Sequence, residues 1–283
     1  MKWATGGFGG MEVVMGKLRL GILGNGYLAG IVVEAFEKGL LPEYELVGIM
    51  GRTPEKTGAL AERAGCAPCG SIGELLDRKP DYIAEAASVA AVRDYAVRIL
   101  EAKCGLVVLS IGAFADRNFY EQVGKAAAAN GVRVHIASGA VGGFDVLKTI
   151  AAMGGASGRI ENYKAPASLN GAPHLEGREL PEDRQERIFD GTAREAIVGF
   201  PKNVNVAVAS ALASVGVDRM QVTIDSCPGM EDNVHKIVVE NHSVTAVVEI
   251  ASRPDADNPK SSVMTAWSVV ALLANLADPV QFF

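Results

Sequence analysis

Residues 17–38 read KLRLGILGNGYLAGIVVEAFEK, a short apolar run followed by a glycine-rich turn and a helical repeat of apolar residues. Within the turn, Gly24, Gly26 and Ala29 fit the pattern G-x-G-x-x-A, whose small residues allow a tight turn and close packing of helix on strand. Taken alone the pattern is weak, because any flexible glycine-rich turn can match it. The secondary structure on either side of the turn therefore decides whether it is a nucleotide-binding turn.

Short apolar runs and helical periods alternate along the first half of the chain. Strands are predicted at 17–24, 44–50, 81–88, 105–112 and 132–138, with helices at 28–38, 54–65, 90–103 and 116–131 and a short one opened by a Ser71 to Glu74 capping box. Short apolar strands separated by helices indicate a parallel sheet covered on both faces. We therefore predict an α/β fold whose residues 17–140 form a Rossmann-type, doubly wound, dinucleotide-binding domain.

In this βαβ context the glycine turn predicts a cradle for a pyrophosphate. Gly26 lets the backbone approach the phosphates, and the amides at the start of the helix around Tyr27 and Leu28 face their charge. The second predicted strand ends in Met50-Gly51-Arg52-Thr53, without the carboxylate that holds a ribose 2′-hydroxyl. Arg52 is either a ligand for a 2′-phosphate or a solvated loop residue, so NADP is expected as readily as NAD.

Strand-like segments dominate after residue 140. Strands are predicted at 159–169, 220–226, 235–241 and 243–252, an apolar helix at 200–216, and a capping box from Thr192 to Glu195. We interpret 141–257 as a second domain of α+β type, whose apolar character and several strands suggest a homodimer formed across its sheet. A helix within 258–283 is expected to return to the Rossmann domain or the domain junction, and residues 1–16 to form a flexible N-terminal extension.

The composition of the chain limits the kinds of partner that it is expected to bind. The 283 residues are 49% hydrophobic and carry a formal net charge of -6, with no run of basic residues suited to a nucleic-acid backbone. No apolar stretch is long enough for a membrane span and no signal peptide is recognisable, so we expect a cytoplasmic protein that binds neither nucleic acid nor membrane. Cys66 and Cys69 have the spacing of a redox pair or half a zinc site, but no second pair completes four metal ligands. A structural strand edge is favoured over a labile thiol pair, and no metal is expected.

Histidine is the side chain best suited to proton transfer near neutral pH. His135 falls in an apolar strand, His242 in a hairpin turn and His174 in a polar loop, which suits structural or solvated roles. His235 follows the polar segment 231–234, where a carboxylate could orient its ring. It is the candidate catalytic residue, with a structural role as the alternative.

Several motifs along the chain are more specific than the glycine turn. In order they are SIGAFAD (110–116), ASGAVGGFDVLK (137–148), FDGTAREA (189–196), FPKNVNVAVASAL (200–212), DNVHKIVVE (232–240) and NPKSSVMTAWS (258–268). Through them the sequence resembles the L-aspartate dehydrogenase family from residue 17 to the last helix. The resemblance implies reversible NAD(P)-dependent oxidation of L-aspartate through iminoaspartate to oxaloacetate and ammonia, with the imine able to feed NAD biosynthesis. It also implies that His235 is catalytic and that Ala140 and Asn205 contact the cofactor. In the same way it implies that 141–257 is a substrate-binding and dimerisation domain with a mixed sheet, which carries the homodimer interface.

The chain departs from the family pattern at two places. Tyr27 is bulkier than the usual residue of the glycine turn, and 163–167 reads YKAPA where relatives tend to carry Thr-Arg-Lys-Pro-Pro. A dicarboxylate needs cations or amides at both ends. The expected substrate ligands are Ser138, Lys164, Arg194, Lys202 and Asn203, with a helix-surface or salt-bridged role as the equal alternative for Arg194 and Lys202.

Three alternatives remain open at this stage. The chain could be a dehydrogenase or imine reductase for another amino or oxo acid, because the substrate-end segment differs. It could also sense NADP(H) without turnover, or act as a redox-sensing thiol protein through Cys66 and Cys69.

Overall fold

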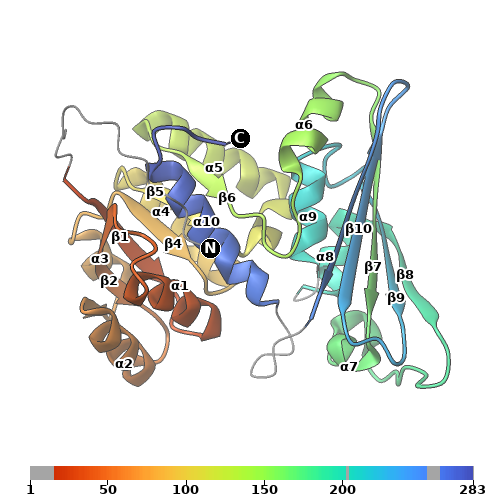
Figure 1. The fold of residues 1–283 in the computed structure, drawn as a ribbon, viewed down its shortest axis with the longest axis horizontal. Helices are drawn as coiled ribbons and strands as arrows, with labels where there is room; N and C mark the ends of the chain where they lie inside the picture. The colour runs from red at the N-terminus through yellow and green to blue at the C-terminus, as the bar shows by residue number, and fades with distance from the viewer. Residues whose placement is uncertain (1–15, 202–203, 254–261, 283) are drawn as a thin grey trace.

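The computed structural model describes residues 16–201, 204–253 and 262–282, and its strands form two separate sheets (Figure 1). The first sheet has six strands: β1 (Leu18–Leu23), β2 (Tyr44–Met50), β3 (Ala67–Cys69), β4 (Tyr82–Glu85), β5 (Gly105–Val108) and β6 (Val134–Ile136). All are parallel, in the order β3-β2-β1-β4-β5-β6. This is the order of a dinucleotide-binding sheet, so the predicted Rossmann-type fold is confirmed.

Helices cover both faces of the first sheet. They are α1 (Tyr27–Glu37), α2 (Pro54–Ala64), α3 (Ile72–Leu76), α4 (Val89–Glu101), α5 (Arg117–Asn130) and α10 (Val263–Ala277), with a 3₁₀ turn η1 (Ile111–Ala115) after β5. Ser88 and Asp116 begin α4 and α5 by accepting bonds from backbone amides of the first helical turn. Apolar residues of β1 belong to two hydrophobic cores. Leu20 and Ile22 lie in the core beneath α1, and Leu23 lies in the other.

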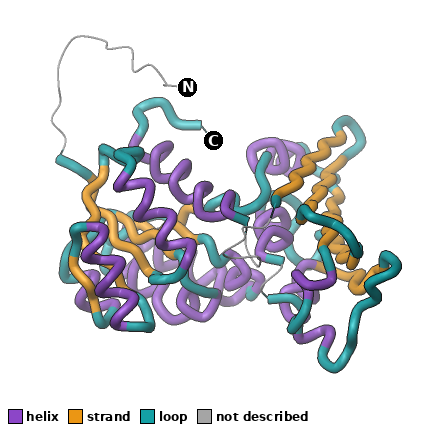
Figure 2. The backbone as a smooth tube through the Cα atoms, turned by 60° about the horizontal axis from the view of Figure 1, so that its bottom comes forward, coloured by secondary structure: helices purple, strands orange, loops and turns teal. Residues whose placement is uncertain are grey.

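The last helix belongs spatially to the first sheet. α10 packs beside α1, and the Tyr44 hydroxyl donates to the Leu273 carbonyl at 2.8 Å. Ser268 accepts a bond from the Gly139 amide at 2.9 Å, which connects α10 to the loop that follows β6. Residues of the first sheet's layer therefore come from both before and after the second sheet in the chain. Figure 2 shows the same backbone in another orientation.

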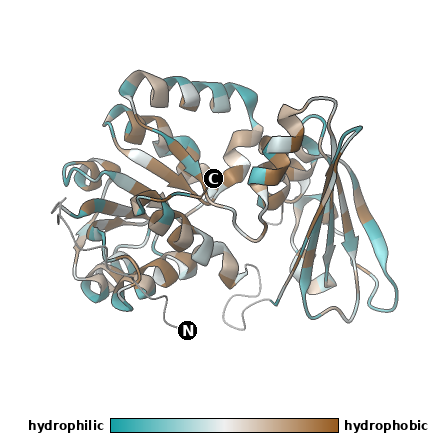
Figure 3. Cartoon of the chain, turned by 45° about the horizontal axis from the view of Figure 1, so that its top comes forward, coloured by the Kyte–Doolittle hydropathy of each residue, from teal (hydrophilic) through white to brown (hydrophobic). Residues whose placement is uncertain are grey.

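The second sheet is mixed, as predicted. Its strands are β7 (Ser157–Lys164), β8 (Glu186–Thr192), β9 (Gln221–Ser226), β10 (Asn233–Glu240) and β11 (Thr245–Ser252), in the order β11-β10-β7-β9-β8 with only β7 and β9 parallel. α6 (Phe144–Ala152), α8 (Ala193–Gly199) and α9 (Asn205–Leu212) lie on one face of this sheet (Figure 1). Its strands alternate between hydrophilic and hydrophobic residues, whereas those of the first sheet are mostly hydrophobic (Figure 3).

Local predictions differ from the structure at four places. The strand predicted over 105–112 ends at Val108 and is followed by the 3₁₀ turn η1. The strand predicted over 159–169 ends at Lys164, because Pro166 lacks an amide hydrogen and begins the short helix α7 (Pro166–Leu169). The helix predicted over 200–216 occupies only Asn205–Leu212. The sequence reading did not include β8, which follows the 3₁₀ turn η2 (Pro173–Leu175).

The capping box at Thr192 is present, and Cys69 ends an edge strand as expected. All four cysteines are free, and burial raises the pKa of Cys66 to about 11, which makes this thiol unreactive near neutral pH. Within the described residues, no helix combines the length and apolarity needed to cross a bilayer. The predicted extension lies outside the described residues except for Gly16.

Candidate active site

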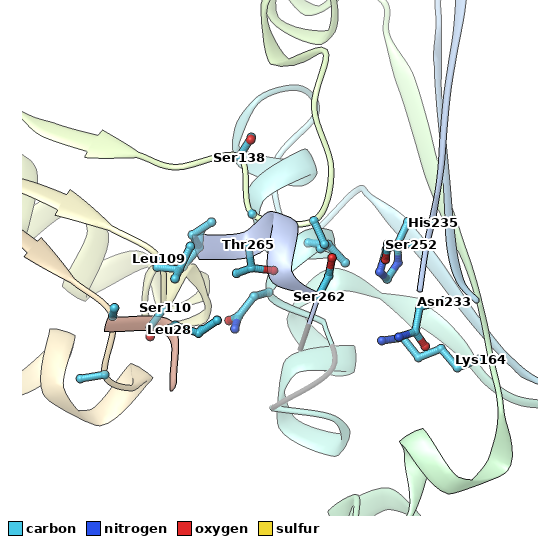
Figure 4. A pocket seen from close by; sticks show the side chains of 17 residues that line it. Leu28, Leu109, Ser110, Ser138, Lys164, Asn233, His235, Ser252, Ser262 and Thr265 are labelled. Atoms are coloured by element: carbon cyan, nitrogen blue, oxygen red, sulfur yellow. The ribbon is translucent and has the colours of Figure 1, made fainter. Parts of the chain in front are cut away.

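A cavity lies between the carboxyl ends of the first sheet and the helix-covered face of the second (Figure 4). The loops after β4, β5 and β6 form one wall and the strands β7, β10 and β11 the opposite wall, while α1, α9 and α10 contribute single turns. The lining residues that carry the argument are Ser110, Lys164, Asn205, Asn233, His235 and Ser252. Open α/β sheets bind their ligands at such carboxyl ends.

A second cavity continues the first along the sheet edge. It is lined by the glycine turn, the end of β2 and the start of α4, and it shares Ala86 and Ala87 with the first cavity. The two cavities together form a crevice that crosses the carboxyl ends of β1 and β4. An elongated dinucleotide requires this shape.

The glycine turn fits such a ligand. Gly24 has a φ of +134°, and a Cβ there would lie 2.4 Å from the carbonyl oxygen of Ala86, so no side chain can be accommodated. Gly26 precedes the first turn of α1, has no side chain to cap the helix and faces open space. Its neighbouring amides are therefore accessible to a phosphate group.

The adenosine end of the crevice contains the predicted Arg52. Its side chain is exposed and lines the second cavity, and no carboxylate occupies the loop from Gly51 to Thr53. Asn25 donates to the Thr53 carbonyl and to the Thr57 hydroxyl, both at 2.9 Å, which connects the glycine turn to the loop after β2. Leu28 lines the first cavity, whereas Tyr27 lines neither.

His235 lies on β10 with only 3% of its surface exposed, and it lines the first cavity. Its Nδ1 atom is 2.8 Å from Oδ1 of Asn162, the residue paired with it on β7. Asn162 Nδ2 donates to the Thr223 carbonyl at 2.9 Å, so Oδ1 is the atom turned toward the ring. An amide oxygen only accepts, hence Nδ1 carries the hydrogen and Nε2 has a free lone pair. From the sequence, a carboxylate from 231–234 was expected to orient this ring. That prediction was wrong, because β10 pairs with β7 and brings Asn162 to the ring.

Burial and a nearby cation keep His235 neutral. Desolvation, followed by the charge of Lys164, lowers the pKa of His235 to about 3. Burial also lowers the pKa of Lys164 to about 8. Both side chains line a cavity that has no carboxylate among its described lining residues.

Lys164 shares one corner of the cavity with Asn233 and Ser252. Lys164 and Asn233 are each 7% exposed, and the Ser252 hydroxyl is buried without a hydrogen-bond partner in the described structure. Figure 4 shows all three beside His235, opposite Leu28, Leu109 and Ser110. A buried cation that has unsatisfied donors beside it and no counter-charge among the described lining residues is chemically suited to an anionic ligand.

The remaining predicted site residues do not all line the cavity. Ser138, Ala140 and Asn205 line the cavity, and Asn205 Oδ1 accepts from the Gly112 amide at 2.9 Å. Arg194 instead forms an ion pair with Asp218 and donates to the Ala115 carbonyl at 2.7 Å, and it is not among the cavity's lining residues. Lys202 and Asn203 lie outside the described residues.

Sequence reasoning missed Asn162, Asn233 and Ser252. Asn162 stands two positions before Lys164 and Asn233 two before His235, so each pair shares a strand face. That alternation was a usable signal, but strand pairing was needed to bring the two faces together. No cluster of three or more potential metal ligands occurs within the described ranges.

Comparison with known proteins identifies the family. The model "Aspartate dehydrogenase, C-terminal" matches residues 145–276, and "Homoserine dehydrogenase, NAD binding domain" matches 24–137. An L-aspartate dehydrogenase from Methanosarcina mazei is 34% identical over 268 residues, covering 93% of this chain and 98% of that protein. The chain belongs to the L-aspartate dehydrogenase family. It is thus an NAD(P)-dependent amino-acid dehydrogenase.

Other relatives agree with this family membership. An L-aspartate dehydrogenase from Methanococcus maripaludis is 32% identical, over 93% of this chain and 98% of that protein. The crystal structure of aspartate dehydrogenase from Thermotoga maritima superposes with a TM-score of 0.75 at 27% identity, covering 95% of this chain and all of that one. The family resemblance and the cofactor class, NAD or NADP, predicted from the sequence are confirmed.

Proposed function

We propose that this protein catalyses the reversible NAD(P)-dependent oxidation of L-aspartate through iminoaspartate to oxaloacetate and ammonia, with His235 as the general acid and base. The observation that carries the proposal is the oriented, neutral imidazole in the cavity that continues the dinucleotide crevice. The bound cofactor supplies the hydride chemistry. The chain's own residues bind, orient and exchange protons.

The glycine turn and Arg52 hold the adenosine and pyrophosphate end of the cofactor in this proposal. Asn205 and the backbone at Ala140 hold the nicotinamide end, since both line the cavity that contains His235. An Arg52 guanidinium with no carboxylate beside it in the loop after β2 supports binding of NADP as well as NAD.

His235 acts through its free Nε2 atom. A neutral imidazole accepts a proton from the substrate ammonium or from the water that attacks the imine, and it returns one when the carbinolamine collapses. Pairing of Lys164 with a substrate carboxylate offsets the charge that lowers the pKa of His235. Substrate binding would therefore raise the pKa of His235 by removing the smaller of its two causes, while desolvation would still hold that pKa below its ordinary value.

The corner formed by Lys164, Asn233 and Ser252 receives a substrate carboxylate. A lysine, an amide and a hydroxyl give an anion charge-assisted hydrogen bonds, and a substrate without that carboxylate leaves the lysine buried and unpaired. Ser138 lines the same cavity and is retained as a substrate ligand. Arg194 is not, because its guanidinium is committed to Asp218 and Ala115.

A substrate panel tests the proposed reaction. Reduction of NAD and of NADP is followed by absorbance with L-aspartate, D-aspartate, L-glutamate and L-alanine in parallel. We expect absorbance to grow with L-aspartate alone. Growth with another amino acid would assign a different dehydrogenase, and cofactor binding without turnover on any amine would assign a sensor.

We further propose a homodimer formed across the second sheet. The helices cover only one face of that sheet, and the opposite face carries charged side chains such as Arg159, Glu161 and Arg187. Light scattering during size-exclusion chromatography measures the mass directly. A monomeric mass at micromolar concentration would contradict the dimer.

A further inference from the structure

Glu85 is a fully buried carboxylate that the proposed reaction does not use. It ends β4 with none of its surface exposed. Oε1 accepts from the Ala87 amide, the Ser88 amide and the Ser110 hydroxyl at 2.8, 2.9 and 2.8 Å. Oε2 accepts from the amides of Leu109 and Ser110 at 3.2 and 2.9 Å.

These bonds connect two loops that form the cofactor crevice. Ala86 and Ala87 line both cavities, and Leu109 and Ser110 line the cavity of His235. The Ala86 carbonyl is also the group that packs against Gly24 of the glycine turn. Glu85 therefore lies beneath the point where the loops after β1, β4 and β5 meet.

The charge of Glu85 has no counter-ion. Within the part of the chain that the structure describes, all its hydrogen bonds come from amides and one hydroxyl, and no cation is bonded to it. Burial raises the pKa of Glu85, and the hydrogen bonds from Ser110, Ala87 and Leu109 partly oppose that shift. The ionised form accepts from all five groups, four of which are backbone amides that cannot accept. A protonated carboxyl could donate only to the Ser110 hydroxyl, which would then lose its own bond to Glu85.

We propose that Glu85 positions the two crevice loops and that its buried negative charge favours the oxidised, positively charged nicotinamide over the neutral reduced one. The oxidised ring carries a formal positive charge that hydride transfer removes. An uncompensated anion in the low-dielectric wall of the crevice therefore interacts differently with the two cofactor states. This inference rests on the proposed function only in that the crevice binds a nicotinamide dinucleotide.

The dissociation constants of NAD+ and NADH, measured by calorimetry without substrate, test the proposal. In Glu85→Gln we expect NAD+ binding to weaken at least threefold more than NADH binding. Ser110→Ala is the control that removes one donor and keeps the charge, so it should weaken both ligands equally. Equal weakening of NAD+ and NADH in Glu85→Gln, or no change in either, would overturn the role of the charge.

A second pair of variants covers the case in which Glu85→Gln does not fold. Ser110→Lys places an ammonium beside the carboxylate, and Ser110→Met provides a neutral side chain of similar length. The preference for NAD+ is the dissociation constant of NADH divided by that of NAD+. This ratio should be lower in Ser110→Lys than in Ser110→Met, and equal ratios in the two variants would overturn the proposal. Neither readout depends on aspartate turnover, so a wrong substrate assignment leaves this test intact.

Discussion

Asn162 fixes the ring of His235. Its Oδ1 lies 2.8 Å from His235 Nδ1, and its own Nδ2 is held by the Thr223 carbonyl. The contact crosses from β7 to β10 between paired residues, so the two strands set the orientation of the imidazole. A neutral amide orients the ring without stabilising its protonated form, unlike the carboxylate of a Ser-His-Asp arrangement.

Exchanging this amide for a carboxylate should change the acid-base behaviour. We expect Asn162→Asp to raise the pKa of His235, because a negative charge favours the imidazolium, and to move the acidic limb of the kcat/KM profile upward by about one to three pH units. Asn162→Ala is the comparison that removes orientation without adding charge; it should lower kcat. An unchanged pH profile in Asn162→Asp would show that Asn162 does not control the ring.

Removing the imidazole should affect chemistry rather than cofactor binding. We expect His235→Ala to lower turnover by about 10² to 10⁴, the usual contribution of a positioned acid or base. The affinity for NAD, measured by calorimetry, should stay within about twofold of wild type. Near-normal turnover in a folded variant would exclude His235 from proton transfer.

Removing the buried cation should separate binding from chemistry. Lys164→Met keeps the approximate length and deletes the charge, so we expect a higher KM for L-aspartate. Because Lys164 lowers the pKa of His235, that pKa should rise in the variant. Arg194→Met is the matched control, since Arg194 does not line the cavity, and its KM should stay near wild type. The two variants would change KM equally if Lys164 had no contact with substrate.

The lowered pKa of Lys164 predicts that the free energy of unfolding depends on pH. Its folded pKa is about 8 against an ordinary value of 10.5, so the unfolded chain binds more protons between these values. Stability from this group therefore rises with pH across that window, by up to about 3 kcal/mol. Urea unfolding from pH 7.5 to 10.5 should show this rise in wild type relative to Lys164→Met. Parallel curves for the two proteins would contradict the buried charged lysine.

The two glycines of the turn should respond differently to alanine. Gly24→Ala places a Cβ against the Ala86 carbonyl at positive φ, so we expect lower thermal stability as well as loss of cofactor binding. Gly26→Ala meets open space, so the chain should fold normally and lose NAD affinity through the crowded phosphate approach. Full NAD affinity in Gly26→Ala would show that phosphates do not approach there.

The sequence by itself determined the first sheet and the family, and it supplied the glycine turn and His235 as candidate site residues. Alternating strand and helix periods, together with the glycines at 24 and 26, are local signals that act over a few residues. The motif order likewise placed the chain in its family before any strand pairing was known.

Only the tertiary structure decided the partners within the site. Asn162 meets His235 because β7 and β10, which are distant in sequence, pair in one register. Asn233 meets Ser252 because the hairpin of β10 and β11 places its two ends side by side. Arg194 pairs with Asp218, whereas Lys164 is enclosed and pairs with no carboxylate among the described residues, although both are simply basic residues in the sequence. Such pairings depend on contacts between remote segments and on burial, which local periodicity does not encode.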